Sequence, residues 1–196
     1  MAGALRFARW ALAPLRRWVA RSWQQDDPWE RLPYAAKAQA FGVGSVHPFP
    51  WYFEGESAVD VSCLDDICAW LMQCTYVRDP ELFNESDFWQ HPRTFERLRQ
   101  GDCEDHAIWA WRKLVELGLD AELVSGTWQP PNTSADGHVW VRFRQDSMEY
   151  IFESVARTRE QIVRPFSEAK AEYIPHAGVD REFRQHTYAG YLRAPK

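Results

Sequence analysis

The chain has 196 residues and a mass of 23.0 kDa, enough for one domain with a buried core and an appended segment. Its hydrophobic fraction of 45% and charged fraction of 26% are ordinary for a globular protein. The net charge of -5 is uneven, because residues 1–25 contain five arginines and no acid. The rest of the chain carries 18 basic and 28 acidic residues, and a body this acidic argues against nucleic-acid binding.

The first 23 residues form a basic amphipathic pattern, which we treat as an N-terminal arm over residues 1–25. At helical spacing its apolar side chains share one face and its arginines the other, and Pro14 would interrupt the helix. Arginine recurs too often for a signal peptide or a membrane span, so we expect a cytoplasmic protein without a cleavable signal. Three interpretations stay open: a membrane-surface helix, a transit-like presequence, or an arm that docks on the body or on a partner protein.

The next segment, residues 26–57, is rich in proline, glycine and aromatic residues and predicts an irregular but ordered wrap. From Ala58 to Tyr76, apolar residues at helical spacing predict a core helix. This helix would hold Cys63, Cys68 and Cys74, whose spacing matches no zinc or redox motif. We therefore expect these three thiols to be reduced core residues.

A second helix is predicted to begin in the stretch Gly101-Asp-Cys-Glu-Asp-His-Ala107. Gly101 can turn the backbone, Asp102 is a good N-cap, and Gly118 follows the last apolar residue of the pattern. Cys103 would then lie in the first helical turn, where the partial positive charge of the helix end lowers the pKa of a thiol. A buried structural cysteine is the alternative, so a catalytic role requires a base from elsewhere in the chain.

Three strands are predicted after this helix, over residues 121–127, 138–144 and 149–153, and the last two are close enough to form an antiparallel hairpin. His138 follows a glycine-containing loop, and Glu153 ends the hairpin. If both side chains lie on one face, the carboxylate can accept the imidazole N–H, and the imidazole can take the proton of Cys103. Each residue alone has an ordinary structural explanation, but the ordered set predicts a thiol nucleophile with its base and an orienting acid.

The motifs around Cys103, Asp136-Gly-His-Val-Trp-Val141 and Tyr150-Ile-Phe-Glu-Ser154 together resemble the transglutaminase-like superfamily, and most of all the bacterial transglutaminase-like cysteine proteinases. The resemblance covers about residues 58–155. It implies an α+β, papain-like fold with a nucleophile helix packed on an antiparallel sheet. It also implies that Cys103 is the nucleophile and His138 the base. Glu153 stands where this bacterial group usually has Asp, and it is one methylene longer.

The same resemblance bears on two further features. The oxyanion hole would combine the Cys103 backbone N–H with a second donor, for which Trp89 is the first candidate, and a core role for Trp89 is the alternative. Carboxylates beside the thiol oppose its ionisation. Either they point away, with Asp102 capping the helix, or Asp102 and Glu104 bind Ca²⁺, as in some similar bacterial proteases. The chemistry itself requires no cofactor.

The sequence thus predicts a catalytic domain over residues 58–175 and a C-terminal tail over 176–196. The expected function is that of a cysteine peptidase or amidase, which acts on a protein or peptide substrate through a Cys-His-Glu triad and a thioester. Transfer to an amine in place of water would make it a transglutaminase-like acyltransferase. The alternative is a catalytically inactive domain of the same fold, tethered by its N-terminal arm and used for binding.

Overall fold

The computed structural model describes residues 27–37 and 39–193. The predicted basic arm, residues 1–25, lies outside the described residues. The elements in chain order are β1 (Arg31–Leu32), η1 (Phe49–Phe53), α3 (Leu64–Leu71), β2 (Thr75–Tyr76), α4 (Asp79–Leu82), α5 (Pro92–Leu98), β3 (Gln100–Gly101), α6 (Cys103–Glu116), β4 (Asp120–Trp128), β5 (Asp136–Gln145), β6 (Met148–Phe152), α7 (Arg159–Ile162), β7 (Val163–Pro165), α8 (Phe166–Ala169), η2 (Lys170–Glu172), β8 (Tyr173–Val179), β9 (Gln185–Tyr188) and η3 (Ala189–Leu192). Within these ranges, no helix combines the length and the apolar character that a bilayer span requires.

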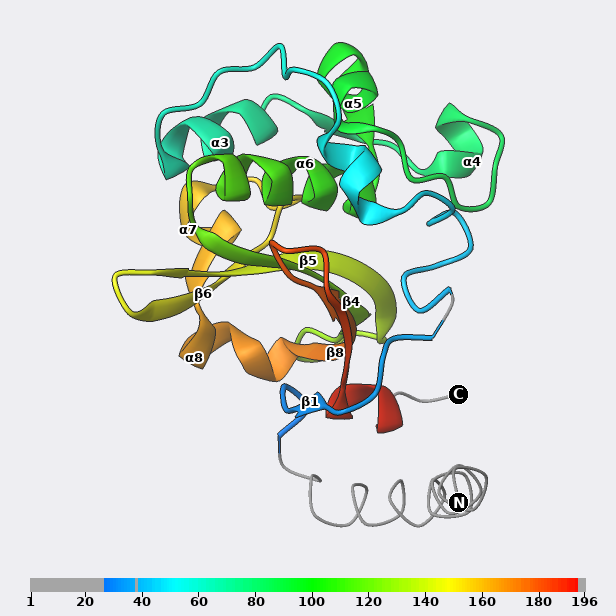
Figure 1. Cartoon of the computed structure of the whole chain (residues 1–196), viewed down its shortest axis with the longest axis vertical. Helices are drawn as coiled ribbons and strands as arrows, with labels where there is room; N and C mark the ends of the chain where they lie inside the picture. Colours follow the sequence, from blue (N-terminus) through cyan, green and yellow to red (C-terminus); the bar gives the residue numbers. More distant parts are fainter. Residues whose placement is uncertain (1–26, 38, 194–196) are drawn as a thin grey trace, which may run out of the picture.

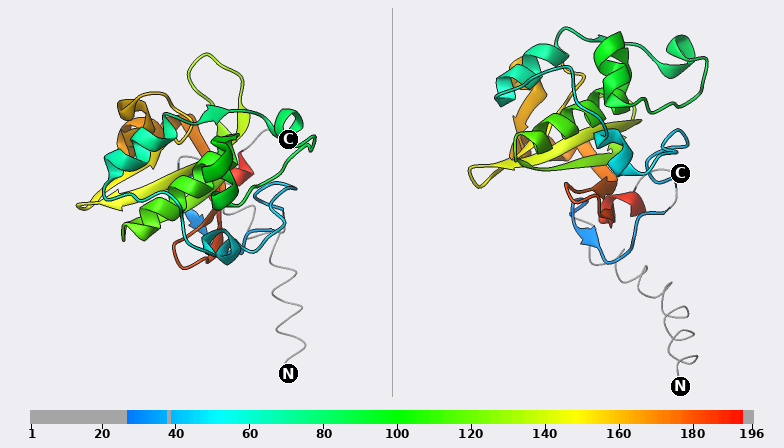
Figure 2. Two further views of the ribbon diagram at one scale, coloured as in Figure 1. Left: turned by 90° about the horizontal axis from the view of Figure 1, so that it is seen from above. Right: turned by 45° about the horizontal axis from the view of Figure 1, so that its top comes forward.

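A seven-stranded sheet in the order β1-β9-β8-β4-β5-β6-β7 forms the centre of the molecule, and all its neighbours pair antiparallel. Helices α3, α5 and α6 cover one face, while α8 lies on the other face (Figure 1). A separate two-stranded parallel sheet joins β2 to β3 just before α6. Figure 2 shows the same layers from two further directions. The fold class is therefore α+β, with the predicted nucleophile helix packed on an antiparallel sheet.

The alternation of side chains along β5 divides the core into two parts. Val139, Val141 and Phe143 face α6 and join a large apolar cluster, in which the indoles of Trp70 and Trp109 stack at 4.0 Å. Trp140 points to the opposite face and packs with residues of β8, β9 and the segment around Trp29. Both faces of the central strands are thus buried, which explains why β4 and β5 are more apolar than a half-exposed strand.

Several elements differ from the sequence-based expectations. The core helix predicted over 58–76 is confined to α3, because Asp60–Ser62 precede the helix and β2 begins at Thr75. Cys63 is exposed at the N-cap of α3, so the prediction that it is a core residue is wrong, whereas Cys68 and Cys74 are buried. All four cysteines are free thiols.

Residues 176–193 are not a peripheral tail. They provide most of β8 and all of β9, and β9 pairs with β1 from the start of the described chain. The prediction of a tail was wrong because β8 and β9 are short and contain scattered polar residues, so their sequences show no clear alternation that would predict a strand. Their place in the sheet is set by partners far away in sequence.

Candidate active site

The N-terminus of α6 places Cys103 near the start of β5, an interior strand of the central sheet. Asp102 occupies the N-cap position, but its side chain forms no capping hydrogen bond, contrary to the sequence-based expectation. Cys103 is partly exposed, and its sulfur lies next to the backbone N–H of Val139, the residue that follows His138. The helix start and the start of β5 therefore meet at this point.

His138 and Glu153 form a buried pair on neighbouring strands. The His138 Nε2 atom lies 2.8 Å from Glu153 Oε2, and both side chains are less than one tenth exposed. Burial raises the pKa of Glu153, but the charge of His138 and the hydrogen bonds from His138 and Tyr173 lower it more, so the carboxyl remains ionised at neutral pH. The hairpin thus brings together the two residues that the sequence selected as base and orienting acid.

The thiol of Cys103 donates its hydrogen bond to Glu104 Oε2, at 3.2 Å. Burial raises the pKa of this thiol well above its usual value, and the carboxylates of Glu104 and Asp102 raise it further. These effects oppose the helix N-terminus, which favours the thiolate. Burial and the acidic neighbours thus together favour the protonated thiol.

Acidic side chains gather around the start of α6 beyond the two that the sequence singled out. Oxygens of Asp79, Asp102 and Asp105 lie within 4.8 Å of one another, as do those of Asp79, Asp87 and Glu104. Asp79 and Asp105 are almost completely buried. Burial raises the pKa of Asp79 to about 6 and those of Glu104 and Asp105 well above their ordinary values.

Some polar atoms in this cluster have no partner. One carboxylate oxygen of Asp79, one of Asp102 and the amide oxygen of Gln90 are buried without a hydrogen bond among the described residues. A buried acceptor without a donor costs about 1–3 kcal/mol. Sequence reasoning missed Asp79 and Asp87, because they lie in a short helix and a loop whose proximity to α6 depends on the tertiary structure. Asp105 was already expected beside the thiol, since it lies in the first turn of α6.

Trp89 occupies a core position. Its indole N–H donates to Asp87 at 3.0 Å, and its ring packs edge-on against Phe41 and Phe49. The indole donor is therefore engaged and is not free to bind an oxyanion, so the structure favours the alternative interpretation of this residue. The Cys103 backbone N–H at the helix start remains a candidate oxyanion donor.

His106, one turn after Cys103, is completely buried. Its Nδ1 lies 2.8 Å from the Asp102 backbone oxygen, and burial lowers the pKa of the imidazole to about 4. The ring is therefore neutral and donates through Nδ1. It supports the first turn of α6 and does not lie on an exposed helix face.

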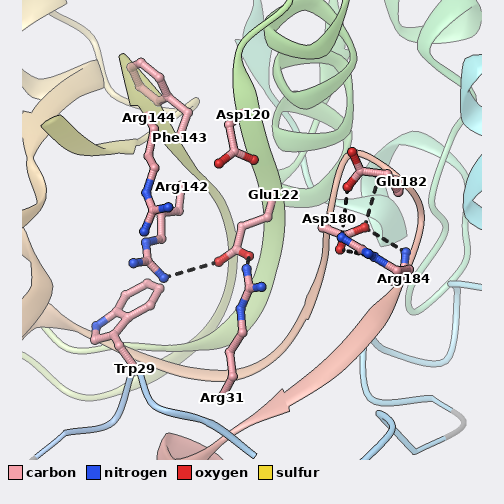
Figure 3. Close-up of a pocket in the computed structure, with 10 residues that line it drawn as sticks. All are labelled: Trp29, Arg31, Asp120, Glu122, Arg142, Phe143, Arg144, Asp180, Glu182 and Arg184. Carbon is pink, nitrogen blue, oxygen red and sulfur yellow. Dashed lines mark hydrogen bonds and ion pairs between the residues drawn. The ribbon is translucent and has the colours of Figure 1, made fainter. Parts of the chain in front are cut away.

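A charged groove of about 420 Å³ lies on the face of the sheet opposite α6 (Figure 3). Its walls include Trp29 and the ion pairs that Glu122 forms with Arg31 and Arg142. Cys103 and His138 do not line it. The groove is therefore separate from the candidate active site.

The site can be compared with known proteins. Residues 87–174 match the family model of the CEP76 peptidase-like domain. This match covers less than half of the chain and supports the predicted resemblance to the transglutaminase-like superfamily. A comparison with curated protein sequences gave no match.

Among solved structures, the chain is similar to LapG from Legionella pneumophila. The calcium-bound form is 22% identical with a TM-score of 0.45, and the match covers 59% of this chain and 62% of LapG. The EGTA-treated form is 23% identical with a TM-score of 0.44, and the match covers 59% of this chain and 60% of LapG. The similarity thus spans less than two thirds of the length of LapG.

Proposed function

We propose that this protein is a cysteine hydrolase, a peptidase or amidase, with Cys103 as nucleophile, His138 as base and Glu153 as the orienting acid. The observation that carries the proposal is the buried His138–Glu153 pair at 2.8 Å, with the Cys103 sulfur beside the N–H of Val139. Since Nε2 of His138 is bonded to Glu153, Nδ1 is the ring nitrogen left to exchange a proton with the thiol.

The reaction would follow from these roles. The thiolate attacks the carbonyl carbon of an amide, and the Cys103 N–H stabilises the oxyanion that forms. The C–N bond then breaks, the imidazolium gives its proton to the leaving amine, and a thioester remains. Water attacks the thioester, His138 accepts a proton from it, and the acid and the free thiol are released. Attack by an amine in place of water would give transamidation.

A divalent cation fits the acidic cluster beside the nucleophile. Ca²⁺ prefers several carboxylate and carbonyl oxygens, and the cluster supplies Asp79, Asp102 and Glu104, together with unpartnered buried oxygens. LapG structures exist in calcium-bound and EGTA-treated forms, which supports calcium as the ion. When bound, the ion would supply positive charge that offsets these carboxylates. Asp79 would then be a third ligand beside the predicted ligands Asp102 and Glu104.

The test is the rate of alkylation of Cys103 by iodoacetamide at pH 7, followed by mass spectrometry with and without calcium. Exposed Cys63 is the internal reference, because its thiol is accessible to the reagent. We expect Cys103 to react faster than Cys63 in calcium and at least about tenfold more slowly in His138→Ala. Equal rates for Cys103 and Cys63 in calcium would contradict the proposal.

One observation favours the second candidate, an inactive binding domain of the same fold. The thiol is hydrogen-bonded to Glu104, and its acidic surroundings raise its pKa. For this candidate, the Cys103 alkylation rate would be unchanged by calcium and by His138→Ala. Isothermal titration with calcium, comparing the wild type with Asp79→Asn and with exposed Asp136→Asn as control, measures the metal site independently of reactivity.

A further inference from the structure

The carboxylate of Glu153 is held by more than the imidazole. The Tyr173 hydroxyl donates to Oε2 at 2.8 Å, the same oxygen that His138 Nε2 contacts at 2.8 Å. The backbone N–H of Val155 donates to the other oxygen at 3.4 Å. Glu153 and Tyr173 are both buried, so water does not compete for these bonds. Three donors therefore converge on one carboxylate.

Tyr173 reaches this position through the sheet. It begins β8, and the β4–β8 register places it opposite Trp128. Its ring lies 5.0 Å from Trp140, and the ring of His138 lies 5.4 Å from Trp128 and 6.1 Å from Trp140. The two indoles limit the motion of the His138 imidazole. The hydroxyl of Tyr173 instead contacts the Glu153 carboxylate, which orients this imidazole.

The length of Glu153 makes this contact important. Glutamate has one more rotatable bond than aspartate, and each free side-chain torsion costs entropy when it is fixed. Burial and the charge of Glu153 raise the pKa of Tyr173, so the hydroxyl keeps its proton and stays a donor at neutral pH. A tyrosine donor and a backbone N–H together can fix a carboxylate that the imidazole alone would leave mobile.

We infer that Tyr173 is a positioning residue of the active site, which acts through Glu153 to hold His138 in the Nε2–H tautomer. The inference rests on the proposed function for its catalytic meaning. The contact itself can be tested without any substrate. Positioning of this kind matters because small displacements of a base reduce the rate of proton transfer.

The test compares Tyr173→Phe with Tyr188→Phe. Tyr188 is an equally buried tyrosine of the same sheet whose hydroxyl bonds Glu122, so its variant controls for the loss of a buried hydroxyl. The readout is the His138 Nε2 proton in nitrogen-edited NMR spectra, assigned by its absence in His138→Ala. We expect this proton to exchange with water at least about tenfold faster in Tyr173→Phe than in wild type, and to be unchanged in Tyr188→Phe. Equal exchange in Tyr173→Phe and wild type would overturn the inference.

A second variant covers the case that Tyr173→Phe does not fold. Glu153→Asp keeps the hydroxyl but shortens the carboxylate, so the three donors no longer converge. We expect faster Nε2 proton exchange in this variant as well, because it breaks the same network. If Tyr173→Phe folds, adding it to Glu153→Asp should change the exchange little further. Wild-type exchange in Glu153→Asp would contradict the inference. A Cys103 that reacts no faster than Cys63 would instead contradict the proposed function and leave the exchange result valid.

Discussion

At the scale of single residues, Glu122 shows how a buried carboxylate is kept ionised away from the active site. It is 5% exposed and lies at the wall of the groove in Figure 3. Its carboxylate accepts hydrogen bonds from Arg31 and Tyr188 and forms an ion pair with Arg142. Burial raises its pKa, but the contact with His186 at 3.4 Å and the charge of Arg31 outweigh burial and leave the pKa below its ordinary value. The ionised form is therefore favoured in the folded state.

This shift predicts a pH dependence of stability. A carboxyl group with a lowered pKa contributes its full stabilisation above its unfolded pKa, about 4.3, and loses it as the pH falls through the folded value. We expect the free energy of unfolding of wild type to fall more steeply below pH 4.3 than that of Glu122→Gln. At pH 7 the variant should be less stable by about 3 kcal/mol, because arginines lose their buried partner. Urea unfolding across pH 3–7 measures both effects.

Exposed Glu182→Gln is the matched control, since its carboxylate pairs only with exposed arginines. Its pH profile should follow that of wild type. If Glu122→Gln gave the same slope as wild type below pH 4.3, the role assigned to the buried carboxylate would be wrong.

The requirement for a glycine at position 101 is also explained at the scale of single residues. The sequence suggested that it turns the chain, but the structure gives a steric reason. A Cβ at this position would lie 2.6 Å from the Gln90 amide nitrogen and 2.7 Å from the Asp105 Cβ. These two side chains are hydrogen-bonded to each other, and Asp105 also accepts from the Gln90 backbone N–H at 2.9 Å. Only a glycine leaves room for this contact beside Cys103.

We expect Gly101→Ala to lower the free energy of unfolding by about 1–3 kcal/mol, because a methyl group is forced into a closely packed site. Gly137→Ala is the control, since a Cβ there meets no atom within 4 Å. Thermal unfolding followed by circular dichroism compares the two. A melting temperature for Gly101→Ala equal to that of Gly137→Ala would refute the steric explanation.

At the scale of elements, α6 holds the irregular segment before α3 through buried cations. The guanidinium of Arg112 donates to the backbone oxygens of Tyr52, Glu54 and Gly55. Lys113 donates to the Val59 oxygen at 2.7 Å. A loop with so few backbone hydrogen bonds of its own depends on such donors, because buried carbonyl groups need partners.

Arg112→Met keeps much of the side-chain volume but removes these donors. We expect faster cleavage by a protease between residues 54 and 60 and a loss of stability of about 2–3 kcal/mol. Exposed Arg97→Met on α5 is the control for the loss of one arginine. Mass spectrometry of limited digests locates the cut, and cleavage at the rate of the control would show that Arg112 does not hold this segment.

At the scale of the whole molecule, β9 joins the two ends of the described chain into one sheet. It pairs with β1 on one side and with β8 on the other. Tyr188 at its end is completely buried and bonds Glu122 of β4. The last strand therefore closes the core on the face opposite α6.

A chain that ends at Val179 should lose cooperative unfolding or melt at least 10 °C lower, since it lacks Tyr188, leaves β1 without its partner strand and exposes one edge of β8. A thermal melt by circular dichroism measures this. Thr187→Ala within β9 serves as the control, because it keeps the strand. Retention of the wild-type melting temperature by the truncated chain would restore the prediction of a peripheral tail.

Local sequence patterns were sufficient to predict those helices and strands whose characteristic spacing lies within consecutive residues. Helix α6, the β5–β6 hairpin and the positions of His138 and Glu153 follow from spacing, turns and alternation, and the structure agrees. Cys63 and Trp89 were less predictable, because burial and hydrogen-bond partners depend on which segments pack beside them.

The order of cysteine helix, histidine strand and glutamate strand is thus a property of the sequence alone, since each element is specified by neighbours in the chain. Only the tertiary structure brought Asp79 to Asp102 and Asp105 at the start of α6, and Tyr173 to Glu153. It also determined that the last strand belongs to the sheet. These contacts join residues far apart in the chain, and their geometry is fixed by packing and hydrogen bonding across the whole fold, which no local periodicity records.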